Sequence, residues 1–165
     1  MPLPRILKNM NLFADGESLH TAIEAMTVPN LALKMDEHRA GGMDMPIEID
    51  MGMEKMELSF QISDPNERVL GLIGLPRVQF MARSAHQRDG EDAEPMTVSM
   101  TGTLKQIELG EFKSGEKAMH TFNVALIYYR LNMAGTDKVE IDPINMIRRI
   151  DGTDVMTSIR SAIGM

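Results

Sequence analysis

Residues 43–62 read MDMPIEIDMGMEKMELSFQI, and the alternation of apolar and polar side chains predicts β-structure. Every odd position up to 53 is Met or Ile, whereas after residues 54–55 the apolar positions are even. Because successive side chains of a strand point to opposite faces, this one-residue slip requires a bulge, a corner or a change of sheet. The apolar residues beyond the slip, 56–62, are expected in the core.

The proline at position 46 limits where the first half of this segment can lie. Proline has no N–H to donate to a strand ladder, so residues 43–53 are expected to form an edge strand or an extended loop. The same alternation predicts strands over residues 77–83, 96–107, 118–131 and 138–142, and an extended segment over 144–150. Residues 84–95 are polar and are expected to form a hairpin loop.

The sequence predicts one helix directly after the segment 56–62. Asp64 is a suitable capping residue, Pro65 fits the first helical position, and Glu67 completes a capping box. An apolar stripe follows over residues 69–73. Residues 155–163 fit a short terminal helix. The chain is therefore expected to be mainly β, with one flanking α-helix.

The composition fits one domain, residues 1–165, and excludes several chemistries. The chain carries 17 basic and 24 acidic residues, for a net charge of −7, which argues against a dedicated binder of phosphate backbones. It has no cysteine, so a disulfide scaffold, a cysteine-ligated metal site and a thiol nucleophile are excluded. It has 17 methionines, which suggests surfaces that adapt as they pack.

No catalytic or metal-binding motif accounts for the polar residues. The four histidines stand outside any zinc-binding spacing, and the sequence has neither a nucleophile elbow nor a phosphate-binding loop. The adjacent pair Arg148–Arg149 is too small for a nucleic-acid footprint. The chain is therefore not expected to be an enzyme or to hold a cofactor or metal. It has no apolar run of membrane-spanning length and no signal-peptide pattern at its start, so no membrane insertion is expected.

Three features instead require partners. Residues 1–12 are expected to form an extended N-terminal arm, residues 38–55 form a long alternating segment, and the strands leave edges unpaired. Open edges aggregate unless something pairs with them. A closed ring that joins the edges of neighbouring copies would solve this by symmetry.

Residues 31–56, LALKMDEHRAGGMDMPIEIDMGMEKM, resemble the major tail tube protein of contractile-tailed phages and of the related R-type pyocins. Further matches to that family are NLFADG at 11–16, GEFKSGEK at 110–117, YYRL at 128–131 and VEIDPINM at 139–146, followed by IDGTD at 150–154. The resemblance runs from about residue 9 to the end and is weakest between residues 76 and 98.

The resemblance implies a β-barrel or sandwich subunit with one flanking helix and a long inter-subunit loop. Six such subunits would form a ring with a continuous inner β-barrel, and stacked rings would form the tube that conducts DNA through the host envelope. The implied partners are other copies of the chain, the tail sheath protein, the baseplate and tail-terminator proteins, and the tape measure protein and DNA in the lumen, without sequence-specific binding. The implied location is the virion tail, assembled in the host bacterial cytoplasm.

Two groups of site residues follow from the resemblance together with the alternation. In the inter-subunit loop, glycines permit backbone geometry closed to other residues, and the Met and Ile face would be buried on a neighbour. The predicted subunit and ring interface comprises Arg39, Gly41, Gly42, Met43, Met45, Asp50, Met51 and Gly52. Polar strand faces are candidates for the lumen, where acidic side chains would give DNA nothing to bind. The predicted lumen-facing residues are Glu57, Ser59, Gln61, Thr97, Ser99, Thr101 and Thr103. The C-terminal segment is residues 144–165.

Two other functions remain open at this point. The first is the tube of an R-type bacteriocin, with the same assembly and no DNA cargo, which the sequence cannot separate from a phage tube. The second is a monomeric β-barrel that binds a small ligand. Aromatic residues usually line such ligand pockets, and here they make up only 4% of the chain, which argues against the second function.

Overall fold

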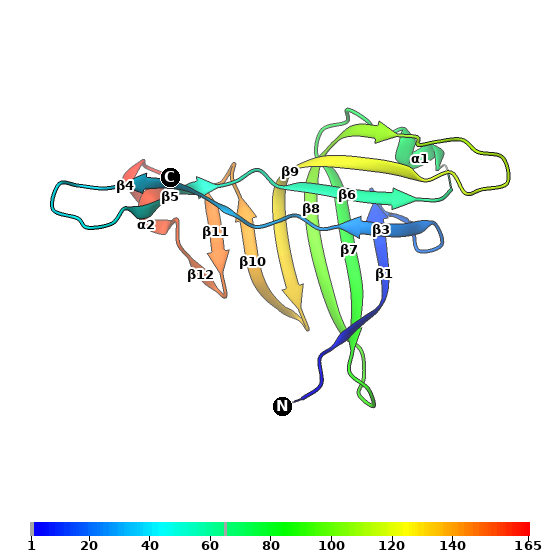
Figure 1. Ribbon diagram of the computed structural model, residues 1–165, viewed down its shortest axis with the longest axis horizontal. Helices are drawn as coiled ribbons and strands as arrows, with labels where there is room; N and C mark the ends of the chain where they lie inside the picture. Colours follow the sequence, from blue (N-terminus) through cyan, green and yellow to red (C-terminus); the bar gives the residue numbers. More distant parts are fainter. Residues whose placement is uncertain (1, 65) are drawn as a thin grey trace.

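The computed structural model describes residues 2–64 and 66–165, and it confirms the mainly β prediction (Figure 1). A ten-stranded antiparallel sheet contains every strand except β4 and β5, which form a separate two-stranded sheet. The strands are β1 (Ile6–Ala14), β2 (Glu17–Ser18), β3 (Ile23–Thr27), β4 (Leu33–His38), β5 (Ile47–Met53), β6 (Glu57–Ile62), β7 (Val78–Gln87), β8 (Glu94–Glu108), β9 (His120–Met133), β10 (Thr136–Asp142), β11 (Ile147–Ile150) and β12 (Thr153–Asp154). The helices are α1 (Glu67–Leu70) and α2 (Thr157–Ala162).

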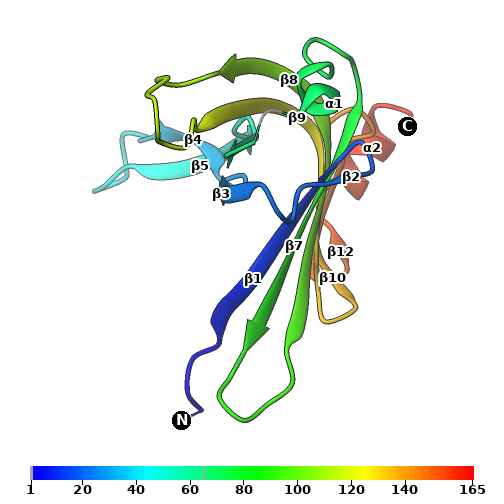
Figure 2. The ribbon, with the colours of Figure 1, turned by 90° about the vertical axis from the view of Figure 1, so that its right-hand side faces the viewer.

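Strand β9 is shared by the two halves of the large sheet. One of its edges pairs with β8, while its other edge pairs first with β6 and then with β10. The register of β8 and β9 shifts between Thr101 and Gly102, and both strands bend in this region (Figure 2). A Cβ atom at Gly102 would lie 2.2 Å from the carbonyl oxygen of Ala125, so only glycine fits there.

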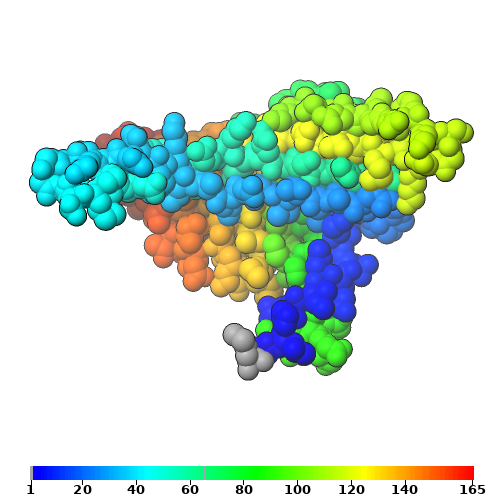
Figure 3. Space-filling model, in the orientation of Figure 1, coloured from blue at the N-terminus to red at the C-terminus, as the bar shows by residue number. Residues whose placement is uncertain are grey.

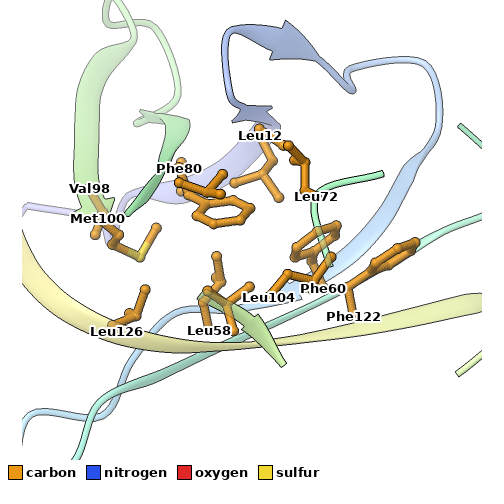
Figure 4. Close-up of a cluster of buried hydrophobic side chains, with 14 of the residues drawn as sticks. Leu12, Leu58, Phe60, Leu72, Phe80, Val98, Met100, Leu104, Phe122 and Leu126 are labelled. Carbon is orange, nitrogen blue, oxygen red and sulfur yellow. The ribbon is translucent and has the colours of Figure 1, made fainter. Parts of the chain in front are cut away.

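The bend folds the sheet over a single hydrophobic core (Figure 4). Phe60 of β6 stacks on Phe122 of β9, with ring centroids 4.9 Å apart, and lies 6.2 Å from Phe80 of β7. Both halves of the sheet therefore face the same core, as in a β-sandwich. The largest fully buried side chains are those of Phe60, Phe80, Phe122, Leu12, Leu19, Leu58, Ile62, Met100, Leu104, Val69, Val98 and Val124.

The phase slip in the sequence is a change of sheet. β5 ends at Met53 in the small sheet, and β6 begins at Glu57 in the large sheet. Beyond the slip, Met56 and the apolar residues of β6 are buried as predicted. β5 also begins directly after Pro46, as expected for a residue that cannot donate to a ladder.

The predicted cap of the first helix is wrong. The side chain of Asn66, not Asp64, accepts hydrogen bonds from the backbone N–H groups of Arg68 (3.0 Å) and Val69 (3.3 Å). Position 65 lies outside the described residues. The helix α1 is only one turn long, and it contributes the buried Val69 to the core. The terminal helix expected over residues 155–163 is present as α2.

The two ends of the chain are more ordered than expected. Within the predicted arm over residues 1–12, the chain from Ile6 onward pairs with β7 as part of β1, and residue 1 lies outside the described residues. Residues 144–165 fold back as β11, β12 and α2, and Arg160 donates to the Asp154 carboxylate at 2.6 Å. The loop expected over residues 84–95 is shorter, because β7 continues to Gln87. No helix among the described residues has the length and apolar character needed to span a membrane.

Candidate assembly surfaces

The hairpin of β4 and β5, which we call the arm (residues 33–53), projects from one end of the molecule (Figure 3). Every residue of β4 is exposed, and so are the first five residues of β5. The predicted inter-subunit loop, residues 38–55, covers the tip and the returning strand of this arm. The sequence pattern did not predict the first strand of the arm, β4, because Leu33 and Met35 alone give a weak alternation.

On one face of the arm, β5 presents a row of apolar side chains, whereas β4 presents Asp36 and His38. Ile47 and Ile49 lie on this face and are 47% and 43% exposed. Asp36 pairs in register with Ile49, so its side chain lies on the same face, whereas Glu37 and Glu48 pair on the opposite face. A monomer rarely leaves such a row of apolar side chains in water, so this face has the character of an interface.

The tip of the arm is closed by short-range hydrogen bonds. Met43 N–H donates to the carbonyl oxygen of Ala40 at 3.1 Å, and Arg39 Nε donates to the carbonyl oxygen of Met43 at 3.2 Å. Gly41 and Gly42 have no positive φ, and a Cβ atom at either would meet nothing within 4 Å. The expectation that they need glycine-only backbone geometry is therefore wrong within this chain, because the tip is open and its turn suits any residue.

Gly52 is the glycine of the arm that does need its backbone freedom. Its φ is +107°, and the register of β4 and β5 shifts by one residue beside it, between Leu33 and Met35. This is the geometry of a β-bulge, which an L side chain would strain. The bulge lies at the base of the arm, where β5 approaches the main sheet.

Asp50 anchors the arm to the body of the same subunit. Its carboxylate accepts from Arg148 Nη2 at 2.8 Å and from the backbone N–H of Gly52 at 2.8 Å. The hydrogen bond from Arg148, followed by that from Gly52, holds the pKa of Asp50 below its usual range. Asp50 was predicted as an interface residue, and the subunit gives it an intramolecular partner that no local sequence signal indicated.

The candidate lumen residues divide between the two halves of the bent sheet. Thr97, Ser99 and Thr101 of β8 pair with residues of β7. Thr103 pairs instead with Ala125 of β9, whose other neighbour is Glu57 of β6. All seven candidates alternate with buried residues of their strands and so point away from the core, and the two groups lie on either side of the bend in β8.

Glu57 is not the free acid that the lumen prediction assumed. Lys105 Nζ donates to its carboxylate, and Lys55 Nζ lies 3.3 Å from the same oxygen. The hydrogen bond from Lys105, followed by that from Lys55, lowers the pKa of Glu57. The face of β6 is therefore polar around Glu57 rather than acidic there, because two lysines share the one carboxylate.

His120 is the one buried histidine among the described residues. It is 3% exposed, neither ring nitrogen has a hydrogen-bond partner, and the ring of Phe112 lies 6.5 Å away in an edge-on arrangement. No group of three His, Asp or Glu side chains within the described ranges is arranged to hold a metal ion.

Comparisons with known proteins point in one direction. The family model of phage tail tube protein FII matches residues 4–164. The tail tube protein of Escherichia phage P2 is 34% identical over 172 residues, covering 100% of both chains. The major tail tube protein of Serratia phage KSP20 is 27% identical over 169 residues, covering 100% of this chain and 99% of that protein.

Solved structures share the fold at low sequence identity. A chain of the sheath-tube complex of the extracellular contractile injection system PVC has a TM-score of 0.59 and 9% identity, covering 76% of this chain and 88% of that chain. A chain of the anti-feeding prophage baseplate has a TM-score of 0.61 and 12% identity, covering 82% and 100%. At these identities the likeness concerns the fold alone.

Proposed function

The chain belongs to the phage tail tube protein FII family, and from this premise we propose that it polymerises as stacked hexameric rings into the inner tube of a contractile phage tail. It is a tail tube protein, and this family is structural. The proposed role therefore needs neither catalysis nor a cofactor. The arm, exposed over nearly all its length and with a row of apolar β5 side chains on one face, is the observation that carries the proposal.

Open strand edges support a closed ring. β3 pairs only with β6, and residues 105–108 of β8 pair only with β9 among the described residues. These two edges bound a four-stranded part of the sheet, β3–β6–β9–β8. Joining the β3 edge of one copy to the β8 edge of the next gives a head-to-tail contact, which closes into a ring when the rotation fits. Six copies would then form the continuous inner β-barrel.

We place the bore against the outward face of this four-stranded part, with Glu57, Ser59, Gln61 and Thr103. Lys55 and Lys105 share the Glu57 carboxylate there, so each lysine has an acidic neighbour that competes with a phosphate backbone. The other half of the sheet carries Arg83 and Arg130 on its outward face, and neither is among the described arginines that form ion pairs. Free guanidinium groups would hold passing DNA.

The proposed partners follow from the tail. The sheath would surround the tube, baseplate and terminator proteins would cap its ends, and the tape measure protein and DNA would occupy its lumen without sequence-specific binding. Contractile injection systems with the same fold contain tube, sheath, baseplate and cap components, which supports this kind of partner. The location would be the virion tail, after assembly in the host bacterial cytoplasm.

The phage function is favoured over the bacteriocin tube because both curated relatives described above are phage proteins. A monomeric ligand-binding barrel finds no support in this family.

Electron microscopy of the purified chain, together with light scattering, tests the proposal. Tubes with sixfold end-on views are expected at raised protein concentration. A matched pair of variants, Ile47→Asp on the apolar face of the arm and Glu48→Gln on the opposite face, separates the arm's role from general solubility. Tubes should be lost only with Ile47→Asp. Rings of another symmetry, or a wild-type chain that stays monomeric at every concentration and in the presence of its baseplate, would overturn the proposal.

A further inference from the structure

The outward face of β1, β7, β8 and β9 is hollowed. A cavity of about 470 Å³ opens there, and an adjoining one of about 630 Å³ shares Arg83 with it. The two together form a trough along these strands. Its floor is partly apolar, and the lining of the first cavity includes Phe13, Met81, Ser99, Thr101 and Tyr128.

Two cations, Arg83 and Arg130, line this trough and are outside the described ion pairs. The Arg83 guanidinium lies 5.9 Å from the ring centroid of Phe13, and its Nε donates to Met81 Sδ at 3.4 Å. Arg130 also lines the cavity. Neither belongs to the arginines that form ion pairs within residues 2–64 and 66–165. The trough therefore offers a partly apolar floor and two guanidinium groups outside the described ion pairs.

The arm has the complementary chemistry. The face that carries Ile47 and Ile49 also carries the Asp36 carboxylate, in register with Ile49, and His38, in register with Ile47. Asp36 is not among the described carboxylates that form ion pairs. An arginine can bind a carboxylate through two parallel hydrogen bonds, and burial of the isoleucines adds hydrophobic stabilisation.

We propose that the trough receives the arm of a second copy of this chain, with Asp36 bound by Arg83 or Arg130 and the isoleucines against Phe13 and Met81. The inference rests on the proposed polymerisation and names the surface that receives the arm. The arm of the same copy cannot serve, because Asp50 holds its base to Arg148 and the hairpin projects away from the body (Figure 3).

Cysteine pairs test the contact directly, since the chain has no cysteine of its own. The variant Ile49→Cys with Ser99→Cys places one thiol on the apolar face of the arm and one in the trough. The control, Glu48→Cys with Ser99→Cys, moves the first thiol to the opposite face. After mild oxidation of assembled tubes, a ladder of linked multimers is expected on a non-reducing gel for the first pair and is expected to be absent for the control.

Charge exchange gives a second measurement. Asp36→Arg is expected to abolish tube formation, and combining it with Arg83→Asp or Arg130→Asp should restore tubes. Glu37→Arg, on the other face, should assemble normally. The docking proposal would be overturned if assembled tubes gave no ladder of disulfide-linked multimers and the thiol at position 99 stayed accessible to maleimide. The trough would then be left to another partner, such as an acidic face of the sheath. Failure of the unmodified chain to form tubes would instead overturn the proposed function.

Discussion

Asp50 on the arm and Arg148 on β11 are 98 positions apart in the sequence and form an ion pair, with Arg148 Nη2 at 2.8 Å from Asp50 Oδ2. The arginine side chain is only 17% exposed, so its position is set by the strand around it. The contact ties the base of the arm to the C-terminal hairpin of the same subunit. The direction in which the arm leaves the body therefore depends on residues that lie far from it in the chain.

Removing this ion pair should free the arm without unfolding the subunit. In the variant Asp50→Asn, amide hydrogen exchange in residues 33–53 should become faster, while the core strands β6 and β9 exchange as before. Mass spectrometry of peptic fragments measures both regions in one experiment. Glu48→Gln on the same strand is the control, since Glu48 is not part of a described ion pair. Equal exchange in the two variants would contradict the tethering role.

Acid should weaken the folded subunit. The pKa values of Asp50, Glu57, Asp154 and Glu24 all lie below their usual range, Asp154 chiefly through the backbone N–H of Met156 and Glu24 chiefly through Lys117. A carboxyl with a lowered pKa in the folded state takes up its proton more readily in the unfolded chain. Stability should thus be constant near neutral pH and fall once the pH drops below about 4, the ordinary carboxyl range.

Urea midpoints of the subunit measured between neutral and acid pH check this prediction. The variant Arg148→Gln should show a shallower fall, because it removes the main cause of the shift at Asp50. Midpoints that stay flat or rise on acidification would count against it.

Gly102 should tolerate no side chain. A Cβ atom there would lie 2.2 Å from the carbonyl oxygen of Ala125, and the strands at the bend would have to separate. We expect Gly102→Ala to lower the free energy of unfolding by about 3 kcal/mol, at the upper end for overpacking, or to prevent folding. Gly41→Ala is the matched control, because a Cβ atom at Gly41 meets nothing within 4 Å. Urea denaturation followed by circular dichroism compares the two, and equal stability would refute the account of the bend.

Gly42→Val separates folding from assembly. A Cβ atom at Gly42 meets nothing within the subunit, so the variant should fold with wild-type stability. As part of the predicted ring interface, the same position should not accept a branched side chain once a second copy is in contact. Electron microscopy should therefore show folded subunits and no tubes. Tubes of normal length would remove Gly42 from the interface.

Glu57→Lys tests the bore. In the variant, Lys55 and Lys105 would lose their acidic partner and stand beside a third lysine, so the face of β6 would become a cluster of free cations. Assembled particles should then eject DNA more slowly, since cations bind the phosphate backbone. Single-particle ejection kinetics measure this, with Lys55→Glu as the oppositely charged control. Unchanged kinetics in assembled Glu57→Lys particles would contradict the proposed bore face.

Much of the fold could be predicted from alternation alone. The period of two located β5, β6, β8 and β9, and the slip after Met53 marked the change of sheet because a strand can bury only one face at a time. The helix cap could not be predicted in the same way. Asp64 and Asn66 both suit an N-cap, and only the backbone path decides which side chain reaches the free N–H groups.

The candidate site was predictable only in outline. Exposure of the arm followed from Pro46 and the alternating Met and Ile residues, but the partner of Asp50 lies on another strand and left no local signal. Nor could strand patterns reveal that Thr101 and Thr103 fall on either side of a bend. That division depends on Gly102, whose isolated position within a strand was the available hint.

The direction of the arm also determines how the subunit would respond to a pulling force. Strand β6 continues the direction of β5 and is paired along its whole length with β9 (Figure 1). Antiparallel hydrogen bonds run perpendicular to the strands, so a pull on the arm along its axis acts on all of the β6–β9 bonds together rather than one after another. In a tube driven through an envelope, tension on the arm would therefore load the β6–β9 hydrogen bonds in shear. The arm would separate from the subunit only when all of these bonds broke together.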